Sequence, residues 1–301
     1  MQTLLALLLM QYVVSVKAGL VNHVQGNASV VERETAAVGS PIRTGTDGYV
    51  EVLLSPGSFL RLGEDSEARI DDENLQSVRV TVLRGPAVIE VVEIPKESPI
   101  TVTTGNLTTR IIDSGIYRFA DGTATVIQGK LQTKDSQFTY EKGWQVFFKD
   151  SYRARKTGKI QATSLDVYSQ ARSEVIARAN YSLTSSLNGP STYGIYNSWL
   201  YTPYIGVYTF IPRSGFRSPY GYQYYGIGAR RVASRSGNNG SDNSSSNTTT
   251  PSQSTGNTPN DSGNGGGNSA PAPTASTPSG ERTAPAVYIE SKSSTVGATA
   301  R

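Results

Sequence analysis

An alternation of apolar and polar residues with a period of two runs through the first half of the chain, from about Gly19 to Lys159. Short runs rich in Val, Ile, Thr and Tyr are separated by Gly, Pro and acidic residues, at a spacing of roughly eight to twelve positions that is typical of all-β proteins. The pattern predicts a sandwich, barrel or solenoid in which consecutive strands pair antiparallel, with one sheet face buried and the other wet.

The clearest hairpin is expected at Tyr49–Leu54, where Val50, Val52 and Leu54 alternate with Glu51 before a Ser-Pro-Gly-Ser turn. Leu60 and Leu62 continue the alternation on the return strand, with Arg61 between them. Further strands are expected at Val78–Val82, Ala87–Ile94, Ile100–Thr104, Leu107–Ile112, Ile116–Phe119, Thr123–Gln132, Phe138–Tyr140 and Trp144–Phe148.

An ordered set of these motifs resembles the FecR-type periplasmic domain. The segment Ile42–Ile70 is similar to the first half of that domain, and Leu83–Gly85, Pro99–Thr104, Gly115–Phe119 and Val126–Leu131 are similar to the second half. In the best-known members, the domain follows a cytoplasmic segment and a membrane helix and relays a receptor signal to a sigma factor. Neither part precedes the domain here, so the resemblance implies the fold and a role in the cell envelope rather than direct control of a sigma factor.

One amphipathic helix is expected at residues 163–187, after a β domain at residues 19–160. Thr163-Ser-Leu-Asp166 is close to a capping box, and an apolar stripe follows at spacings of three or four. The stripe is expected to pack on the β domain, with Glu174 and Arg178 paired on the outer side. Its residues are Tyr168, Ala171, Val175, Ala179 and Leu183.

An aromatic, basic segment occupies residues 188–232, and nine of the chain's 17 tyrosines lie between Tyr193 and Tyr225. One interpretation is an irregular wrap that packs over the β domain. The other is a contact surface, because flat aromatic rings and guanidinium groups can bind a protein partner or anionic glycans. The candidate partner-binding residues are Trp199, Tyr201, Tyr204, Tyr208, Arg213, Arg217, Tyr220 and Tyr222.

The two ends of the chain are predicted to lie outside the packed domain. The apolar run from Leu4 to Val16 ends in Val-Lys-Ala, which predicts a secretory signal peptide over residues 1–18 and no stable membrane span after its cleavage. Residues 233–301 are predicted to be a disordered, low-complexity tail, because Ser236–Gly280 contains no Val, Ile, Leu, Met, Phe, Tyr or Trp. A short strand pattern at Ala286–Glu290 either docks on a sheet edge or belongs to the tail.

Composition removes most catalytic chemistry. The chain has no cysteine and one histidine, His23, expected at a surface or strand edge, so thiolate nucleophiles and Cys/His metal sites are excluded. The densest acidic set, Glu64, Asp65, Glu67, Asp71, Asp72 and Glu73, surrounds a strand turn and is expected to be solvated. A net charge of +4, from 28 basic and 24 acidic residues, does not indicate nucleic-acid binding.

Three functional hypotheses follow. The first is a non-catalytic module of the cell envelope, periplasmic or secreted, that contacts another envelope protein and carries no cofactor or metal. The second is a glycan or cell-surface matrix protein that uses the aromatic segment. The third is a carboxylate-dependent enzyme acting on glycans, which would need a close pair of acids in a deep cleft. The identity of the partner and the oligomeric state do not follow from the sequence.

Overall fold

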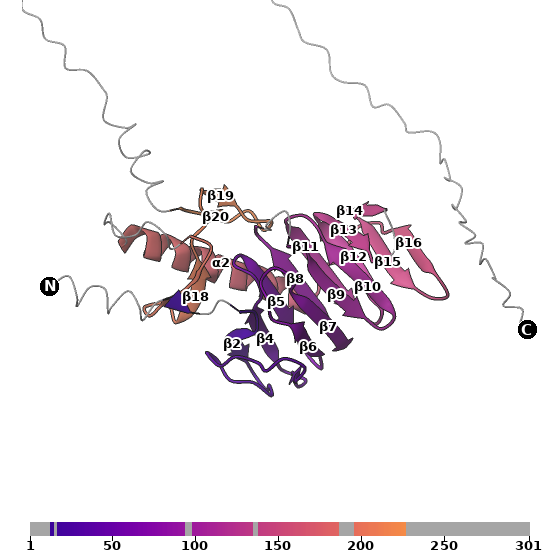
Figure 1. The fold of residues 1–301 in the computed structure, drawn as a ribbon, viewed down its shortest axis with the longest axis horizontal. Coiled ribbons are helices and arrows are strands. Elements are labelled where there is room, and N and C mark those ends of the chain that lie inside the picture. Colours follow the sequence, from indigo (N-terminus) through magenta and orange to yellow (C-terminus); the bar gives the residue numbers. More distant parts are fainter. Residues whose placement is uncertain (1–12, 15–16, 94–97, 135–137, 187–195, 227–301) are drawn as a thin grey trace, which may run out of the picture. The chain divides into compact units, whose positions relative to one another are not determined.

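A computed structural model describes residues 13–14, 17–93, 98–134, 138–186 and 196–226 of the chain. The predicted tail and most of the predicted signal peptide lie outside these residues. The described part is mostly antiparallel β structure with one helix, as expected (Figure 1). Within it, no helix combines the length and the apolar character that a membrane crossing requires.

Two sheets form the β domain. The eight-stranded sheet has the strand order β16-β15-β12-β11-β8-β5-β4-β2, and the seven-stranded sheet has the order β14-β13-β10-β9-β7-β6-β3. The first comprises β2 (Leu20–Gln25), β4 (Tyr49–Leu53), β5 (Ser58–Leu62), β8 (Ala87–Val91), β11 (Gly115–Ala120), β12 (Thr123–Gln128), β15 (Trp144–Phe148) and β16 (Tyr152–Lys156). The second comprises β3 (Pro41–Arg43), β6 (Glu67–Asp72), β7 (Arg79–Arg84), β9 (Ile100–Thr104), β10 (Leu107–Ile111), β13 (Lys130–Thr133) and β14 (Thr139–Glu141).

The main hydrophobic core lies between the two sheets. Alternate residues of each strand contribute to it, such as Val52 and Ile89 from the eight-stranded sheet and Val80 and Val102 from the seven-stranded sheet. These side chains are fully or almost fully buried. The two inner faces therefore explain the period-two pattern of the sequence.

The chain visits the two sheets in turn, and this differs from the expected consecutive pairing. β6 and β7 form a hairpin in one sheet, β8 joins the other sheet, and β9 returns to lie beside β7. Because the chain reverses twice between them, β7 and β9 run parallel, with Val80 opposite Val102. The other strand pairs described are antiparallel.

The segment Thr123–Gln132, expected to be one strand, forms two strands in different sheets. β12 pairs with β11, whereas β13 pairs with β10, and Gly129 lies between them with a φ of 97°. A Cβ atom at Gly129 would lie 2.1 Å from the hydroxyl of Tyr117. A glycine is therefore required where the chain leaves one sheet for the other.

Helix α2 (Ser164–Ser186) covers the outer face of the eight-stranded sheet, and a second core forms beneath it (Figure 1). Leu53 and Phe59 of the sheet meet Ile176 of α2 and Trp199 of the aromatic segment in this second core. As a result, every residue of β4, β5 and β8 is buried.

The aromatic segment, expected to be irregular, contains two short hairpins. β17 (Trp199–Thr202) pairs with β18 (Val207–Phe210), and β19 (Phe216–Arg217) pairs with β20 (Gln223–Tyr224). β1 (Val13–Val14), within the predicted signal peptide, pairs with β17.

Candidate functional site

The N-terminus of α2 is fixed by the capping residues that the sequence indicated. The Thr163 hydroxyl accepts a hydrogen bond from the Asp166 backbone N–H at 3.3 Å, and the Asp166 carboxylate accepts one from the Thr163 backbone N–H at 2.6 Å. Asp166 also pairs with Arg118 of β11. The cap therefore sets both the first turn of the helix and its position on the sheet.

The buried face of α2 is more polar than the expected apolar stripe. Ala171 is exposed and Val175 is only half-buried, whereas Leu165, Ile176 and Leu183 are buried. The other buried positions include Ser169, Arg172, Ser173, Asn180 and Thr184. Glu174 and Arg178 form the expected pair on the outer side, at 3.6 Å.

The polar face of α2 meets a buried charge cluster formed by Glu51, Arg61, Glu90 and Arg172. Arg61 Nε donates to Glu51 Oε2 at 2.7 Å, and Arg61 Nη1 donates to Glu90 Oε2 at 2.8 Å. Arg172 Nη2 of the helix donates to Glu51 Oε1 at 3.0 Å. The first three side chains are fully buried, and Arg172 is nearly so. The cluster links three strands to the helix.

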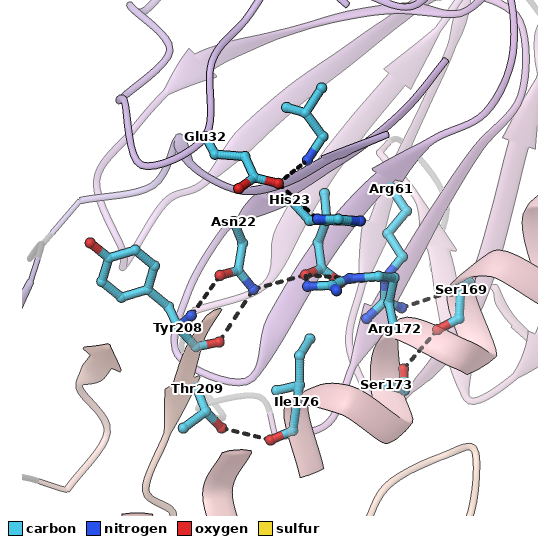
Figure 2. Close-up of polar contacts among 12 residues, drawn as sticks. Asn22, His23, Glu32, Arg61, Ser169, Arg172, Ser173, Ile176, Tyr208 and Thr209 are labelled. Atoms are coloured by element: carbon cyan, nitrogen blue, oxygen red, sulfur yellow. Dashed lines mark hydrogen bonds and ion pairs between the residues drawn. The ribbon is translucent and has the colours of Figure 1, made fainter. Parts of the chain in front are cut away.

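Two serines of α2 complete the polar contacts. Ser169 Oγ accepts a hydrogen bond from Arg61 Nη1 at 2.7 Å, and the Ser173 hydroxyl donates to Glu90. Figure 2 shows Ser169 joined to Arg61 and Ser173 joined to Ser169. Tyr220 of the aromatic segment donates to Ser169 Oγ at 2.9 Å, so that segment also lies against the cluster.

The two glutamates of the cluster have opposite pKa shifts. Burial by itself raises the pKa of Glu51, but the guanidinium groups of Arg172 and Arg61 lower it to about 2. Burial raises the pKa of Glu90. Fewer contacts counteract this effect at Glu90 than at Glu51, chiefly those with Arg61 and Ser173. Among the described residues, Glu90 Oε1 has no hydrogen-bond partner. The contacts of Glu51 therefore compensate the burial of its charge, whereas burial of the Glu90 charge remains unfavourable for the folded state.

A second polar link joins the first strand of the sheet to the aromatic segment. The Asn22 amide donates to Glu51 Oε1 at 2.8 Å and to the Tyr208 carbonyl at 3.2 Å, and its oxygen accepts from the Tyr208 backbone N–H at 2.7 Å (Figure 2). His23, half-buried on the edge strand β2, bonds Glu32 at 2.8 Å. Burial and the nearby charge of Arg172 lower the pKa of His23.

These groups are arranged to hold the molecule together. Glu51 and Glu90 are sealed under α2 and bridged by Arg61, whereas a glycan-cleaving pair must face each other across an open cleft. The acidic set near the β5–β6 turn is spread among separate partners: Glu67 pairs with Arg43, Asp71 with Arg69, and Glu73 with Lys17. In the described residues, no group of three side chains could hold a metal ion.

The candidate partner-binding residues divide into packed and exposed sets. Trp199 is fully buried and packs edge-on against Phe59 and Phe210. Tyr208 is buried, and Tyr222 packs half-buried against the second core. Burial raises the pKa of Tyr220 to about 12, which agrees with its hydrogen bond to Ser169.

The exposed set centres on the turn of the β17–β18 hairpin. Tyr204 is 97% exposed, and all of residues 203–206, here called the hairpin tip, are exposed. Backbone hydrogen bonds from Ile205 and Gly206 to the Thr202 carbonyl close this tip. Tyr201 is half-buried on β17, and Arg213 and Arg217 are exposed beyond the hairpin.

The buried charge cluster was not anticipated from the sequence. One signal was present: Glu51 and Arg61 occupy directly opposite positions of the predicted hairpin. An opposite-charge pair at this position is equally typical of a wet sheet face. The Glu51–Arg61 pair is buried only because helix α2 places Arg172 above it. Arg172 lies 111 positions after Arg61 in the sequence.

Comparisons with solved structures give partial likenesses. Two crystal structures of a provisionally assigned anti-sigma factor from Parabacteroides distasonis, at 1.65 and 2.50 Å resolution, are 15% and 16% identical to this chain. The alignments cover 39% and 47% of this chain, with TM-scores of 0.33 and 0.35. The chain spans 60% and 73% of the lengths of those two proteins. None of the curated proteins matches this sequence.

A family comparison identifies the β domain. Residues 40–132 match the model of the family described as FecR protein. The match runs from β3 into β13 and includes Glu51, Arg61 and Glu90, whereas α2 and the aromatic segment follow it. FecR-like proteins are regulators associated with the cell envelope. The protein therefore contains a FecR domain, built as a two-sheet sandwich.

Proposed function

We propose that this protein is a non-catalytic, signalling-related module of the cell envelope, periplasmic or secreted, that binds another envelope protein through the exposed part of its aromatic segment. The FecR domain at residues 40–132 supports the regulatory and envelope-related part of this proposal. The main support for this contact surface is the difference in exposure within one hairpin. Trp199 is buried there, whereas Tyr204 is 97% exposed.

The hairpin tip has the properties of a protein-binding element. Tyr204 and Ile205 present apolar area on a turn closed by backbone hydrogen bonds, so little conformational freedom is lost on binding. Tyrosine is enriched among the residues that dominate binding energy at interfaces. Tyr201, Arg213 and Arg217 provide further aromatic and cationic side chains in the same segment.

The geometry of the aromatic rings favours a protein partner over stacking on sugars. Tyr201 and Tyr208 are 4.9 Å apart between ring centroids, and their planes are inclined by 51°. Trp199, the largest aromatic side chain of the segment, is fully buried. A coplanar platform of exposed rings, which a glycan surface of this segment would use, is not formed by these three residues.

Site-specific photocrosslinking in intact cells tests the proposal. A photoreactive phenylalanine analogue at position 204 should give one discrete adduct with an envelope protein, because the side chain points away from the fold. The same analogue at Val167, which is 65% exposed on α2, is the matched control and should give none. Tyr204→Ala should then abolish recovery of the identified partner. Equal adducts from both positions, or none from position 204, would contradict the proposal.

A further inference from the structure

The outer face of the seven-stranded sheet carries a hollow separate from the aromatic segment. Its volume is about 350 Å³, within the range of small-ligand sites. The hollow is lined by side chains from β6, β7, β9 and β10 and from the connections beside them. Its lining includes Asp72, Ser77, Arg79, Pro99, Thr101 and Arg110.

Strand register places two arginines on either side of a threonine. Thr101 of β9 lies opposite Arg79 of β7 on one side and opposite Arg110 of β10 on the other. With neighbouring strands about 4.8 Å apart, the two arginine backbones are separated by roughly 10 Å across the hollow. Both arginines are exposed, so their guanidinium groups are accessible to a ligand.

The two arginines are not electrostatically equivalent. Arg79 Nη2 lies 3.6 Å from Asp72 Oδ2, so its charge is largely balanced. Arg110 makes no ion pair or side-chain hydrogen bond within the described residues. Taken together, Asp72, Arg79 and Arg110 leave one net positive charge, located at the Arg110 end of the hollow.

The Asp72 end of the hollow is suited to hydroxyl groups. The Asp72 carboxylate is held by the Asn74 backbone N–H at 3.0 Å and by the Ser77 hydroxyl at 2.8 Å, which fixes its orientation. A carboxylate can accept further hydrogen bonds, because each oxygen has two lone pairs. Thr101 and Ser77 add hydroxyl groups to the wall, and Pro99 adds a small apolar surface.

We infer that this hollow is a binding site for a carboxylate-bearing sugar, such as a uronic acid residue. The sugar carboxylate pairs with Arg110, where the uncompensated positive charge lies, and guanidinium groups bind carboxylates through two parallel hydrogen bonds. The ring hydroxyls donate to Asp72 and exchange hydrogen bonds with Thr101. A second negative charge on the ligand, as on a phosphate, would exceed the one net positive charge of the hollow.

Titration of the full chain with D-glucuronate, followed by ligand-observed NMR, tests this inference. Saturable binding is expected, with weaker binding of the neutral methyl ester of glucuronic acid, which lacks the charge, and of acetate, which lacks the hydroxyls. Arg110→Gln should weaken glucuronate binding roughly 10- to 100-fold, the range for loss of a charge-assisted hydrogen bond.

The matched control is Arg84→Gln, which removes the same charge from an exposed position of β7 outside the lining of the hollow. It should leave glucuronate binding unchanged, and unchanged melting temperatures would show that both variants fold. Three outcomes would overturn the inference: no saturable binding of glucuronate, equal loss in both variants, or acetate binding as strong as that of glucuronate. None of these results depends on the hairpin tip, so the proposed function is tested separately.

Discussion

At the scale of single residues, the environment of a side chain decides its role more than its chemical type. Trp199 and Tyr204 lie five positions apart in one hairpin, yet the first fills the second core and the second is almost fully exposed. Glu51 and Glu90 are likewise both buried glutamates of the eight-stranded sheet, but two guanidinium groups contact Glu51 and only one contacts Glu90.

Truncation of the two aromatic residues should therefore have very different effects on the free energy of unfolding. Trp199→Ala should lower the free energy of unfolding by about 3–5 kcal/mol, because it leaves a cavity between Phe59 and Phe210. Tyr204→Ala should change it by less than about 0.5 kcal/mol, as expected for an exposed site. Urea unfolding monitored by circular dichroism measures both. Similar losses in the two variants would contradict the assignment of packed and exposed positions.

Neutralising the two buried glutamates should also give unequal effects. Glu51→Gln should destabilise the fold by about 3–5 kcal/mol, since Arg61 and Arg172 would keep buried charges without their main partner. Glu90→Gln should cost only about 1 kcal/mol, because an amide still accepts hydrogen bonds and the buried charge is already unfavourable. Chemical denaturation at pH 7 provides the comparison, and a larger loss for Glu90→Gln would refute the assignment.

The pH dependence of stability should follow from Glu51. Its pKa is about 2 in the folded protein and near the ordinary value of 4.5 when unfolded, so its stabilisation is complete above pH 4.5 and is lost as the pH falls toward 2. Glu90 has the opposite effect on the pH dependence. Its pKa is raised in the folded protein, so protonation as the pH falls stabilises the folded state relative to the unfolded state. Melting curves from pH 5 to pH 2 should show a fall in the wild type that is much reduced in Glu51→Gln. Identical slopes would exclude this role of Glu51.

At the scale of elements, the boundaries of strands depend on where the chain changes sheets. β12 and β13 are nearly continuous in hydrophobic pattern, and Gly129 separates them. Helix α2 shows the same dependence, because its buried polar residues are suited only to the charged patch of β4, β5 and β8. The pattern of polar and apolar residues in an element can therefore be interpreted only together with the surface that the element covers.

Alanine at Gly129 should be strongly destabilising. The added Cβ would meet Tyr117 and the Ser114 carbonyl at 2.1 and 2.5 Å, and the positive φ adds strain, for a total of about 3 kcal/mol or more. Gly143→Ala is the matched control, because Gly143 has a φ of 84° and no atom within 4 Å of the added Cβ. Its cost should be about 1 kcal/mol, from backbone strain alone. Equal midpoints of urea unfolding for the two variants would argue against a steric role of Gly129.

At the scale of the whole molecule, the FecR domain, α2 and the aromatic segment form one packed body. The charge cluster joins Glu51 inside the family match to Arg172 outside it, and Asn22 joins the first strand of the sheet to Tyr208. Residues 19–226 should therefore unfold together, whereas the composition of Ser236–Gly280 offers no large apolar residues for a core.

Limited proteolysis should reveal this organisation. Early cuts are expected within Ser236–Gly280, and the resistant fragment should retain the β region, the helix and the aromatic segment. Mass spectrometry of the fragments identifies the cut sites. Early cleavage between Tyr193 and Tyr225 would show instead that the aromatic segment is not held by the charge cluster and the second core.

The sequence by itself determined the features that rest on local pattern. Period-two alternation indicated the strands and the Tyr49–Leu62 hairpin, Thr163 and Asp166 indicated the start of the helix, and the motif order within residues 40–132 indicated the FecR domain. Tertiary structure alone decided which sheet each strand joins, and therefore the parallel pair of β7 and β9. It also decided that Glu51 and Arg61 are buried and that Arg79 and Arg110 flank one threonine. The physical reason is that burial and proximity arise from contacts between residues far apart in the chain, which no local pattern of polarity can specify.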